Sequence, residues 1–205
     1  MSDRTVYVVD DDASVRDALS MLLRVSGYAV ASFGTAPEFL DVCMPGTLGC
    51  IILDVDMPGM DGPALQQELI RRGVQLPVIF LSGKGTIPIT VRTIKAGAMD
   101  FLTKPVDGSV LLARVQKALE QCLLLQKQAE AFQSIALRLA ALTEREREVM
   151  MLAVAGLTNK EIAQRLGISY RTVEIHRTHV MHKSGATNLL ELARIADTFE
   201  SHQTQ

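Results

Sequence analysis

The sequence predicts an α/β domain built on a doubly wound parallel sheet and joined to a smaller all-helical domain. Up to about residue 122, five short apolar runs alternate with segments of helical periodicity. This alternation is typical of a five-stranded sheet of the flavodoxin-like kind, with helices on both faces. From Leu142 onward only helical periodicity remains. We therefore expect domains at 1–122 and 138–205, connected by a helical linker at 123–137.

The strands are predicted from β-branched and apolar runs bounded by turn-forming residues. The first, Val6-Tyr7-Val8-Val9, stops at three aspartates, and the helix that follows is closed by Gly27. The expected strands are 6–9, 28–32, 51–54, 77–81 and 100–103, and the expected helices between them are 13–26, 36–43, 63–72 and 87–96.

The helix that begins near Gly108 is expected to continue beyond the first domain, because no Pro or Gly interrupts it before Gly156. Its apolar residues recur at alternating spacings of four and three, at Leu111, Val115, Ala118, Cys122, Leu125, Ala129 and Phe132. Such a stripe can form a coiled-coil seam with a second copy, or it can pack on its own domain. The pattern leaves both alternatives open.

The C-terminal segment shows strong helix-start patterns. Two T-x-x-E capping boxes begin at Thr143 and Thr158, and the second helix, 160–166, ends at Gly167. Ser169 can then cap a third helix that reaches about residue 183, and Thr187 or Asn188 can cap a last helix at 189–199. Two short helices joined by a glycine turn are a helix-turn-helix arrangement.

Charge is distributed unevenly along the chain, whose net charge is only −2. Residues 1–122 carry eleven Lys/Arg against fourteen Asp/Glu, whereas 156–186 carry five against two. The first segment suits a cation and the second suits nucleic acid. The three cysteines lack metal-ligand spacing, and neither a signal peptide nor an apolar run of membrane-spanning length is evident. We expect reduced thiols in a cytoplasmic protein that does not enter a membrane.

Carboxylates gather at one predicted edge of the sheet. Ile51-Ile52-Leu53 ends on Asp54, at the carboxyl edge where open parallel sheets bind ligands. Strands one and three of such a sheet are neighbours, so Asp10 and Asp11 are expected beside Asp54. Three carboxylates so close together would raise one another's pKa unless a cation neutralised them. Oxygen ligands favour Mg²⁺ over Zn²⁺, so we expect a Mg²⁺ site.

Ser82 and Lys104 end the fourth and fifth strands on the same edge, where they add a hydroxyl and a positive charge. Carboxylate, Mg²⁺, lysine and hydroxyl together indicate a phosphoryl-transfer site. Asp12 and Asp61 are expected to be solvated turn residues.

These motifs resemble the receiver domain of bacterial response regulators. The resemblance rests on Asp10-Asp11, Asp54 with residues 57–62 (M-P-G-M-D-G), Ser82-Gly83 and Lys104-Pro105, and it covers about residues 3–120. It implies that Asp54 accepts a phosphoryl group from the phosphohistidine of a sensor histidine kinase. The chain would then be a phosphoacceptor that at most phosphorylates and dephosphorylates itself slowly, and not an enzyme.

The resemblance also implies individual roles. Mg²⁺ would be held by Asp10, Asp11, the Asp54 side chain and the Asp56 main-chain carbonyl. Lys104 would pair with the phosphate, and Ser82 would bind a phosphate oxygen after moving toward it. Phe101 stands where the family has its switch aromatic, although it could equally be an ordinary core residue. The Lys104–Pro105 bond would be cis.

The third helix of the C-terminal domain has two different faces. One face carries Val173, the stem of Arg177, Val180 and Ser184, and the other carries Arg171, Glu174, Ile175, Thr178 and His182. In a major groove, Ile175 could touch a thymine methyl, Glu174 could accept from cytosine, and Arg171 or Lys183 could meet guanine or phosphate. Lys160, Arg165 and Arg177 could contact the backbone. Without its context, such a helix is more often a solvated surface. Its three histidines do not share one face, which argues against zinc.

Residues 138–200 resemble the LuxR-type helix-turn-helix, through L-T-E-R-E at 142–146, G-L-T-N-K-E-I-A at 156–163, L-G-I-S at 166–169 and T-V-E-I-H-R at 172–177. Ser184 departs from the family, which commonly has an apolar residue there. A receiver followed by this domain is the NarL/FixJ class of transcription activators. The resemblance implies a homodimer when phosphorylated, promoter DNA and RNA polymerase as partners, nitrogen-fixation genes as targets, and a kinase that senses oxygen through haem.

Two other classes of protein compete with this interpretation. Asp54-Val55-Asp56 resembles the D-x-D motif of haloacid-dehalogenase-type phosphatases, but it lies on the third strand and Pro58 stands where that family has Thr or Val. A metabolite-sensing DNA-binding regulator is the second alternative, although no glycine-rich phosphate loop supports it.

Overall fold

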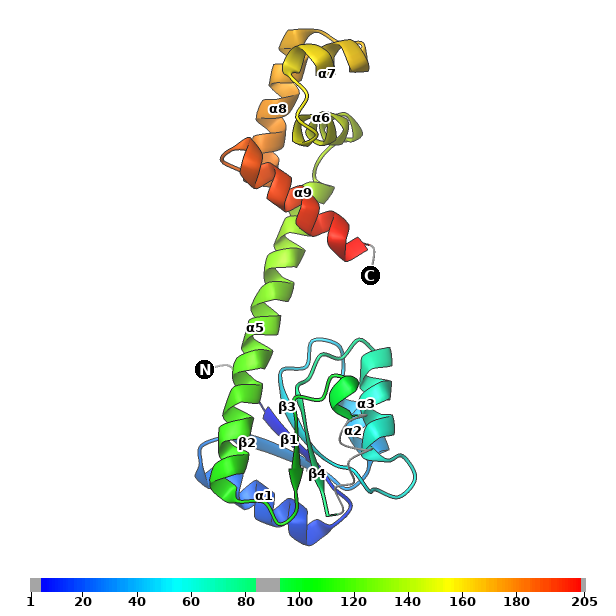
Figure 1. The fold of residues 1–205 in the computed structure, drawn as a ribbon, viewed down its shortest axis with the longest axis vertical. Coiled ribbons are helices and arrows are strands. Elements are labelled where there is room, and N and C mark those ends of the chain that lie inside the picture. The colour runs from blue at the N-terminus through cyan, green and yellow to red at the C-terminus, as the bar shows by residue number, and fades with distance from the viewer. Residues whose placement is uncertain (1–4, 84–92, 204–205) are drawn as a thin grey trace. The chain divides into compact units, whose positions relative to one another are not determined.

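The computed structural model describes residues 5–83 and 93–203. The chain divides into two compact units, Met1–Gln126 and Lys127–Gln205 (Figure 1). The expected boundaries of a separate linker at 123–137 stay a prediction. Among the described residues, no helix combines the length and the apolar character needed to cross a bilayer.

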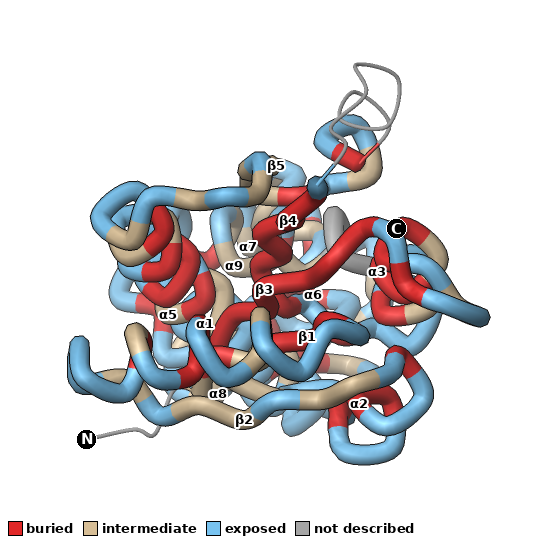
Figure 2. The backbone as a smooth tube through the Cα atoms, turned by 90° about the horizontal axis from the view of Figure 1, so that it is seen from below, coloured by how far each residue is buried: buried red, intermediate tan, exposed pale blue. Residues whose placement is uncertain are grey.

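The N-terminal unit contains a five-stranded sheet in the order β2-β1-β3-β4-β5, and every strand pair is parallel. Its strands are β1 (Thr5–Val9), β2 (Ala29–Phe33), β3 (Gly49–Asp54), β4 (Val78–Ser82) and β5 (Asp100–Thr103). All residues of β3 and β4 are buried, and Figure 2 shows these two strands as the buried centre of the unit. The predicted flavodoxin-like sheet is confirmed.

Helices cover both faces of this sheet. One face packs against α2 (Ala36–Val42) and α3 (Gly62–Arg71), and the other against α1 (Ala13–Val25) and the first turns of α5 (Gly108–Ala140) (Figure 1). Neighbouring positions of each strand alternate between the two cores. In β3, for example, Leu53 belongs to the first core and Ile52 to the second. Of the expected helix at 87–96, most lies outside the described residues, and 93–95 are helical.

Two aspartates expected only as turn residues begin helices. The Asp12 carboxylate accepts hydrogen bonds from the backbone N–H groups of Ser14 and Val15 at the start of α1. The Asp61 carboxylate accepts one from Ala64 at the start of α3. A carboxylate at this position satisfies backbone donors that have no partner within the helix, and such a cap stabilises a protein by about 1 kcal/mol. Both acids therefore fix where their helices begin.

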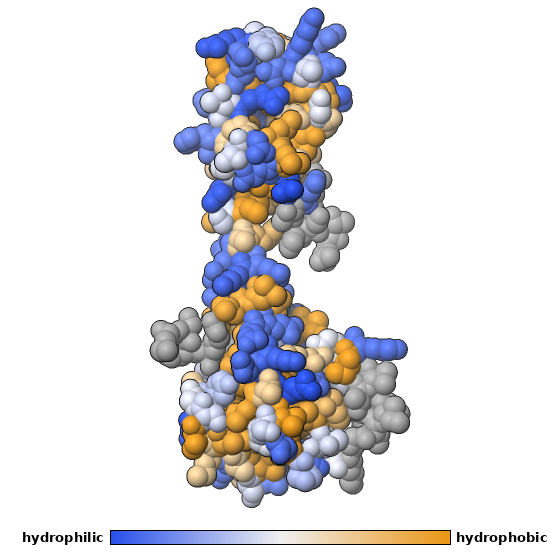
Figure 3. Space-filling view, turned by 60° about the vertical axis from the view of Figure 1, so that its left-hand side comes forward, coloured by the Kyte–Doolittle hydropathy of each residue, from blue (hydrophilic) through white to orange (hydrophobic). Residues whose placement is uncertain are grey.

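The apolar stripe of α5 packs inside each unit. Within the N-terminal unit Leu111, Val115 and Cys122 are buried against the sheet. Within the C-terminal unit the ring of Phe132 stacks on Phe199, with centroids 6.4 Å apart. Intramolecular packing therefore accounts for these four residues. Leu125 is half-buried and Ala129 is exposed, so a coiled-coil seam along that part of the stripe stays a prediction. Other apolar side chains do reach the surface, where Figure 3 shows them interspersed with hydrophilic ones.

The C-terminal unit consists of α6 (Glu144–Val154), α7 (Asn159–Leu166), α8 (Tyr170–Ser184) and α9 (Leu189–Gln203), together with the end of α5. Both predicted capping boxes form, and Ser169 caps α8. Gly167 and Gly185 end α7 and α8 with positive φ angles of 67° and 75°, a conformation that favours glycine. The predicted helix-turn-helix order is confirmed.

Two polar residues lie inside this unit. The Ser184 hydroxyl donates to the carbonyl of Met181 and accepts from the N–H of Ala186, so the departure from an apolar residue leaves no unpaired group there. Glu146 is only 3% exposed, and one of its carboxylate oxygens lies 2.6 Å from the Lys183 ammonium on α8. The same oxygen accepts from the N–H of Thr143. These hydrogen bonds, that from Lys183 foremost, lower the pKa of Glu146 to about 2.

We predict that Glu146→Gln destabilises the C-terminal unit in a pH-dependent way. At pH 7 the loss of a charged, buried partner for Lys183 should cost about 1–3 kcal/mol. Because the pKa of Glu146 is about 2 in the folded chain and 4.5 ordinarily, its stabilising effect is complete above pH 4.5 and is lost as the pH falls toward 2. Calorimetric melting temperatures of variant and wild type should therefore draw together as the pH falls from 5 and should meet only near pH 2. Glu144→Gln, an exposed change in the same helix, is the control. A pH-independent gap between Glu146→Gln and wild type would contradict the assignment.

Gly62 generates a second prediction. A Cβ atom at this position would lie 2.2 Å from the main-chain oxygen of Asp54, so Gly62→Ala must displace the backbone that carries this aspartate. We expect a loss of about 1–3 kcal/mol in the free energy of unfolding of the N-terminal unit, measured by calorimetry. The control is Gly34→Ala, because its new methyl would meet its nearest neighbour at an ordinary 3.6 Å. Equal stability of the two variants would contradict the prediction, because it would show that the backbone at Asp54 shifts without loss of stability.

Candidate functional sites

Three carboxylates converge at the carboxyl edge of the sheet. Val9 of β1 pairs with Leu53 of β3, so the residues that follow these two lie side by side. Asp10, Asp11 and Asp54 each offer an oxygen within 4.8 Å of the others'. Asp10 is 1% exposed and Asp54 is 5% exposed, whereas Asp11 faces solvent. The predicted juxtaposition is confirmed, and it leaves one open side toward water.

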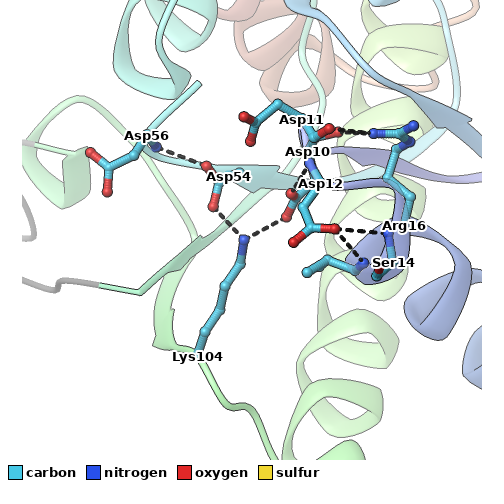
Figure 4. A network of polar contacts seen from close by, with 9 residues as sticks. Asp10, Asp11, Asp12, Ser14, Arg16, Asp54, Asp56 and Lys104 are labelled. Atoms are coloured by element: carbon cyan, nitrogen blue, oxygen red, sulfur yellow. Dashed lines mark hydrogen bonds and ion pairs between the residues drawn. The ribbon is translucent and has the colours of Figure 1, made fainter. Parts of the chain in front are cut away.

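Lys104 bridges two of these acids (Figure 4). Its ammonium lies 2.6 Å from a carboxylate oxygen of Asp10 and 2.6 Å from one of Asp54. Burial lowers the pKa of Lys104, but its hydrogen bonds to the two carboxylates outweigh burial and leave that pKa raised. Burial also raises the pKa of Asp10, against the opposing hydrogen bond from Lys104. The Lys104–Pro105 bond is cis, as the resemblance implied.

The remaining predicted residues surround this cluster. One Asp54 oxygen accepts from the N–H of Asp56 at 2.9 Å, while the exposed side chain of Asp56 points away from Lys104 (Figure 4). Its expected contribution through the main-chain carbonyl stays a prediction. Ser82 is buried at the end of β4, and its carbonyl accepts from the N–H of Lys104. Phe101 is half-buried with its ring centroid 6.3 Å from that of Phe80, and its role as a switch also stays a prediction.

The donor set fits a small, hard cation. Carboxylate oxygens alone form the cluster, and such ligands suit Mg²⁺, which keeps water or phosphate oxygens in its remaining positions. The exposed side at Asp11 leaves room for those ligands, while the buried Asp10 and Asp54 hold the inner side. The arrangement therefore supplies what binding of an anionic group beside a divalent cation requires.

Sequence reasoning missed one residue beside this site. The Arg16 guanidinium donates to the main-chain carbonyls of Asp10 and Asp11 at 2.8 and 2.9 Å (Figure 4). An arginine in the first turn of a helix that follows an acidic loop is the pattern that could have indicated it.

The outer face of α8 is the second candidate site. Arg171, Glu174, Ile175 and Thr178, with His179, line a shallow open hollow on this helix. Ile175 is 46% exposed, although it is apolar, whereas Val173 and Val180 on the other face are buried. The two predicted faces are therefore present. His182 is exposed, as expected for the outer face, and His179 also lines the hollow. The Arg171 guanidinium lies 3.4 Å from the Glu174 carboxylate, so the two side chains are in contact.

Two of the cations expected to contact DNA also link helices within the unit. Arg177 donates to the Asn159 side chain at 2.8 Å, which links α8 to α7. Lys183 pairs with Glu146 and links α8 to α6. Lys160 and Arg165 are exposed on α7. The role of each of these residues in DNA binding stays a prediction.

Comparison with known proteins identifies both units. Residues 6–116 match the response regulator receiver domain, and residues 140–196 match the luxR family of bacterial regulatory proteins. The transcriptional regulatory protein FixJ of Azorhizobium caulinodans is 44% identical over 93% of this chain and 90% of its own length. The response regulator protein TodT of Pseudomonas putida is 39% identical over 96% of this chain and 88% of its own.

A solved structure of the response regulator StyR covers 96% of this chain and 99% of its own, with 39% identity and a TM-score of 0.86. These matches identify a response regulator, so the phosphatase and metabolite-sensor interpretations are set aside. The chain belongs to the response regulator family, as a FixJ-like transcriptional regulator that joins a receiver domain to a LuxR-type DNA-binding domain.

Proposed function

We propose that Asp54 accepts a phosphoryl group from the phosphohistidine of a sensor histidine kinase. The observation that carries this proposal is the position of the Asp54 carboxylate at the sheet edge, beside two other acids and 2.6 Å from Lys104. A carboxylate oxygen of Asp54 forms the new O–P bond while the N–P bond of phosphohistidine breaks. The imidazole nitrogen keeps the electron pair of the broken bond.

Asp10, Asp11 and Asp54, with the main-chain carbonyl of Asp56, would hold Mg²⁺ in this proposal. When bound, the ion neutralises charge that develops on the phosphoryl oxygens. Lys104 is already the partner of the acceptor, because it contacts Asp54 directly. It moves its contact from the carboxylates to the new phosphate, which brings about −1.5 to −2 charge at neutral pH.

The phosphate also recruits Ser82, whose hydroxyl donates to a phosphate oxygen. Ser82 and Thr103 are register partners in β4 and β5, so a shift of Ser82 is transmitted to the strand that carries Phe101. Phe101 is only half-buried beside Phe80, so its ring can become more buried by moving inward. A reshaped β5 surface is then the means by which the receiver pairs with a second copy.

The paired regulator acts in the cytoplasm, where it binds promoter DNA, recruits RNA polymerase and activates transcription. We extend the proposal to nitrogen-fixation genes as its targets and to a haem-based oxygen sensor as its kinase, as the family resemblance implies. The outer face of α8 supports major-groove recognition, because it presents a cation, a carboxylate and an exposed isoleucine together.

Sedimentation velocity with acetyl phosphate and Mg²⁺ tests the phosphoryl switch. We expect the wild type to shift from monomer to dimer and Asp54→Asn to remain monomeric, because an amide cannot accept the phosphoryl group. Asp41→Asn, an exposed acid on α2, should behave as the wild type. Dimerisation of Asp54→Asn to the wild-type extent, or no shift in the wild type, would refute the proposed coupling.

DNA recognition gives a separate prediction for α8. Glu174→Gln should reduce discrimination between promoter and scrambled DNA by about tenfold, since a base contact is worth about 1–3 kcal/mol. Lys160→Gln should instead weaken binding to both sequences and flatten its salt dependence. Fluorescence anisotropy at several salt concentrations measures both effects, with Glu144→Gln on α6 as the charge-matched control. Unchanged discrimination in Glu174→Gln would remove this residue from the readout.

A further inference from the structure

We propose that Arg16 is a positioning residue that sets the geometry of the Asp10–Asp11 loop for Mg²⁺, an inference that rests on the proposed function. Its guanidinium donates to the carbonyls of both aspartates, at 2.8 and 2.9 Å, from one nitrogen, Nη1 (Figure 4). Arg16 belongs to the first turn of α1. It therefore ties the two consecutive acids to the helix that follows them.

The acidic loop depends on few other contacts. On the sheet side, the N–H of Asp10 donates to the carbonyl of Phe33 at 3.2 Å. Within the loop, the N–H of Asp12 donates to the Asp10 carboxylate at 3.0 Å. Asp11 is exposed, so packing does little to fix its direction. On the helix side, Arg16 holds the carbonyls of Asp10 and Asp11, and the neighbouring Asp12 carboxylate caps the start of α1.

Arg16 itself is held in place. Its side chain is partly buried, and the guanidinium lies against Gly34, where a Cβ would meet it at 3.6 Å. The N–H of Gly34 in turn donates to the Glu38 carboxylate of α2. Arg16 therefore spans the loop after β1 and the turn after β2, so that neither loop can shift without disturbing its contacts.

The position of the Asp10–Asp11 loop is important for Mg²⁺ binding, because the ion requires near-octahedral geometry at about 2.0–2.1 Å from each oxygen. Residues that orient metal ligands from behind typically change metal affinity about 10–100-fold when they are removed. Arg16 contacts the main-chain carbonyls of two proposed ligands, Asp10 and Asp11. Lys104 instead contacts the carboxylates of Asp10 and Asp54.

The charge and the position of Arg16 have opposite effects on Mg²⁺, and this makes the inference testable. A guanidinium near a cation site repels the cation, so removal of the charge alone would tighten Mg²⁺ binding. Loss of the two carbonyl contacts would loosen it, because the ligands would no longer be held in place. The direction of the change therefore identifies which effect dominates.

The experiment is calorimetric titration of the full-length chain with Mg²⁺ for wild type, Arg16→Gln, Arg16→Lys and Arg24→Gln. We expect Arg16→Gln to raise the Mg²⁺ dissociation constant about tenfold. Arg16→Lys keeps the charge but lacks the guanidinium, and it should raise the constant by a smaller factor. Arg24→Gln removes an exposed charge from the same helix and should leave affinity within about twofold. Melting temperatures in EDTA show whether each variant is folded at the titration temperature.

Mg²⁺ affinity of Arg16→Gln equal to or tighter than that of the wild type would overturn the inference, provided that the variant is folded. A failure of the proposed function looks different. In that case the wild type itself would show no saturable Mg²⁺ binding, or Asp54→Asn would bind Mg²⁺ as tightly as the wild type.

Discussion

The repulsion among three carboxylates is the constraint around which the receiver unit is arranged. Asp10, Asp11 and Asp54 have oxygens within 4.8 Å of one another, and two of these acids are almost fully buried. Without a cation, such a cluster favours protonated acids or a displaced loop. Lys104 supplies one positive charge between Asp10 and Asp54 and is itself fixed by them. The third acid, Asp11, lies at the solvent side, where its charge is hydrated.

The fold makes this arrangement rigid by placing its parts on buried strand ends. Asp54 closes β3, a strand with no exposed residue, and the Asp54 carbonyl is approached so closely by Gly62 that a methyl group would not fit between them. The strand that carries the acceptor is thus enclosed on both faces of the sheet and at its end. Under the proposed function, a chemical change on Asp54 would therefore act less on β3 than on the Lys104 and Phe101 side chains, which are only half-buried.

Local patterns explain which parts of the structure could be predicted from the sequence. Strand ends, capping boxes and terminal glycines each depend on a few neighbouring residues, so the sheet, the helix order and the convergence of Asp10, Asp11 and Asp54 followed from the sequence. The pair between Glu146 and Lys183 joins residues 37 positions apart, and no local pattern marks it. Arg16 escaped notice for another reason. It donates to main-chain carbonyls, so the side chains of its partners give no signal of the contact, and only its position in the first turn after an acidic loop could have indicated it.

The stripe on α5 shows the limit of periodicity most clearly. A spacing of three and four fits a coiled-coil seam and a helix packed on its own domain equally well, because both bury the same face of a helix. In the structure, two parts of this stripe pack in two different cores. Leu111 to Cys122 pack on the sheet, and Phe132, Ile135 and Leu139 pack within the C-terminal unit, whereas Ala129 between them is exposed. The half-buried Phe132 and Ile135 therefore pack against the C-terminal unit. A fragment that began at residue 138 would lack Phe132 and Ile135 and would leave the ring of Phe199 without its stacking partner.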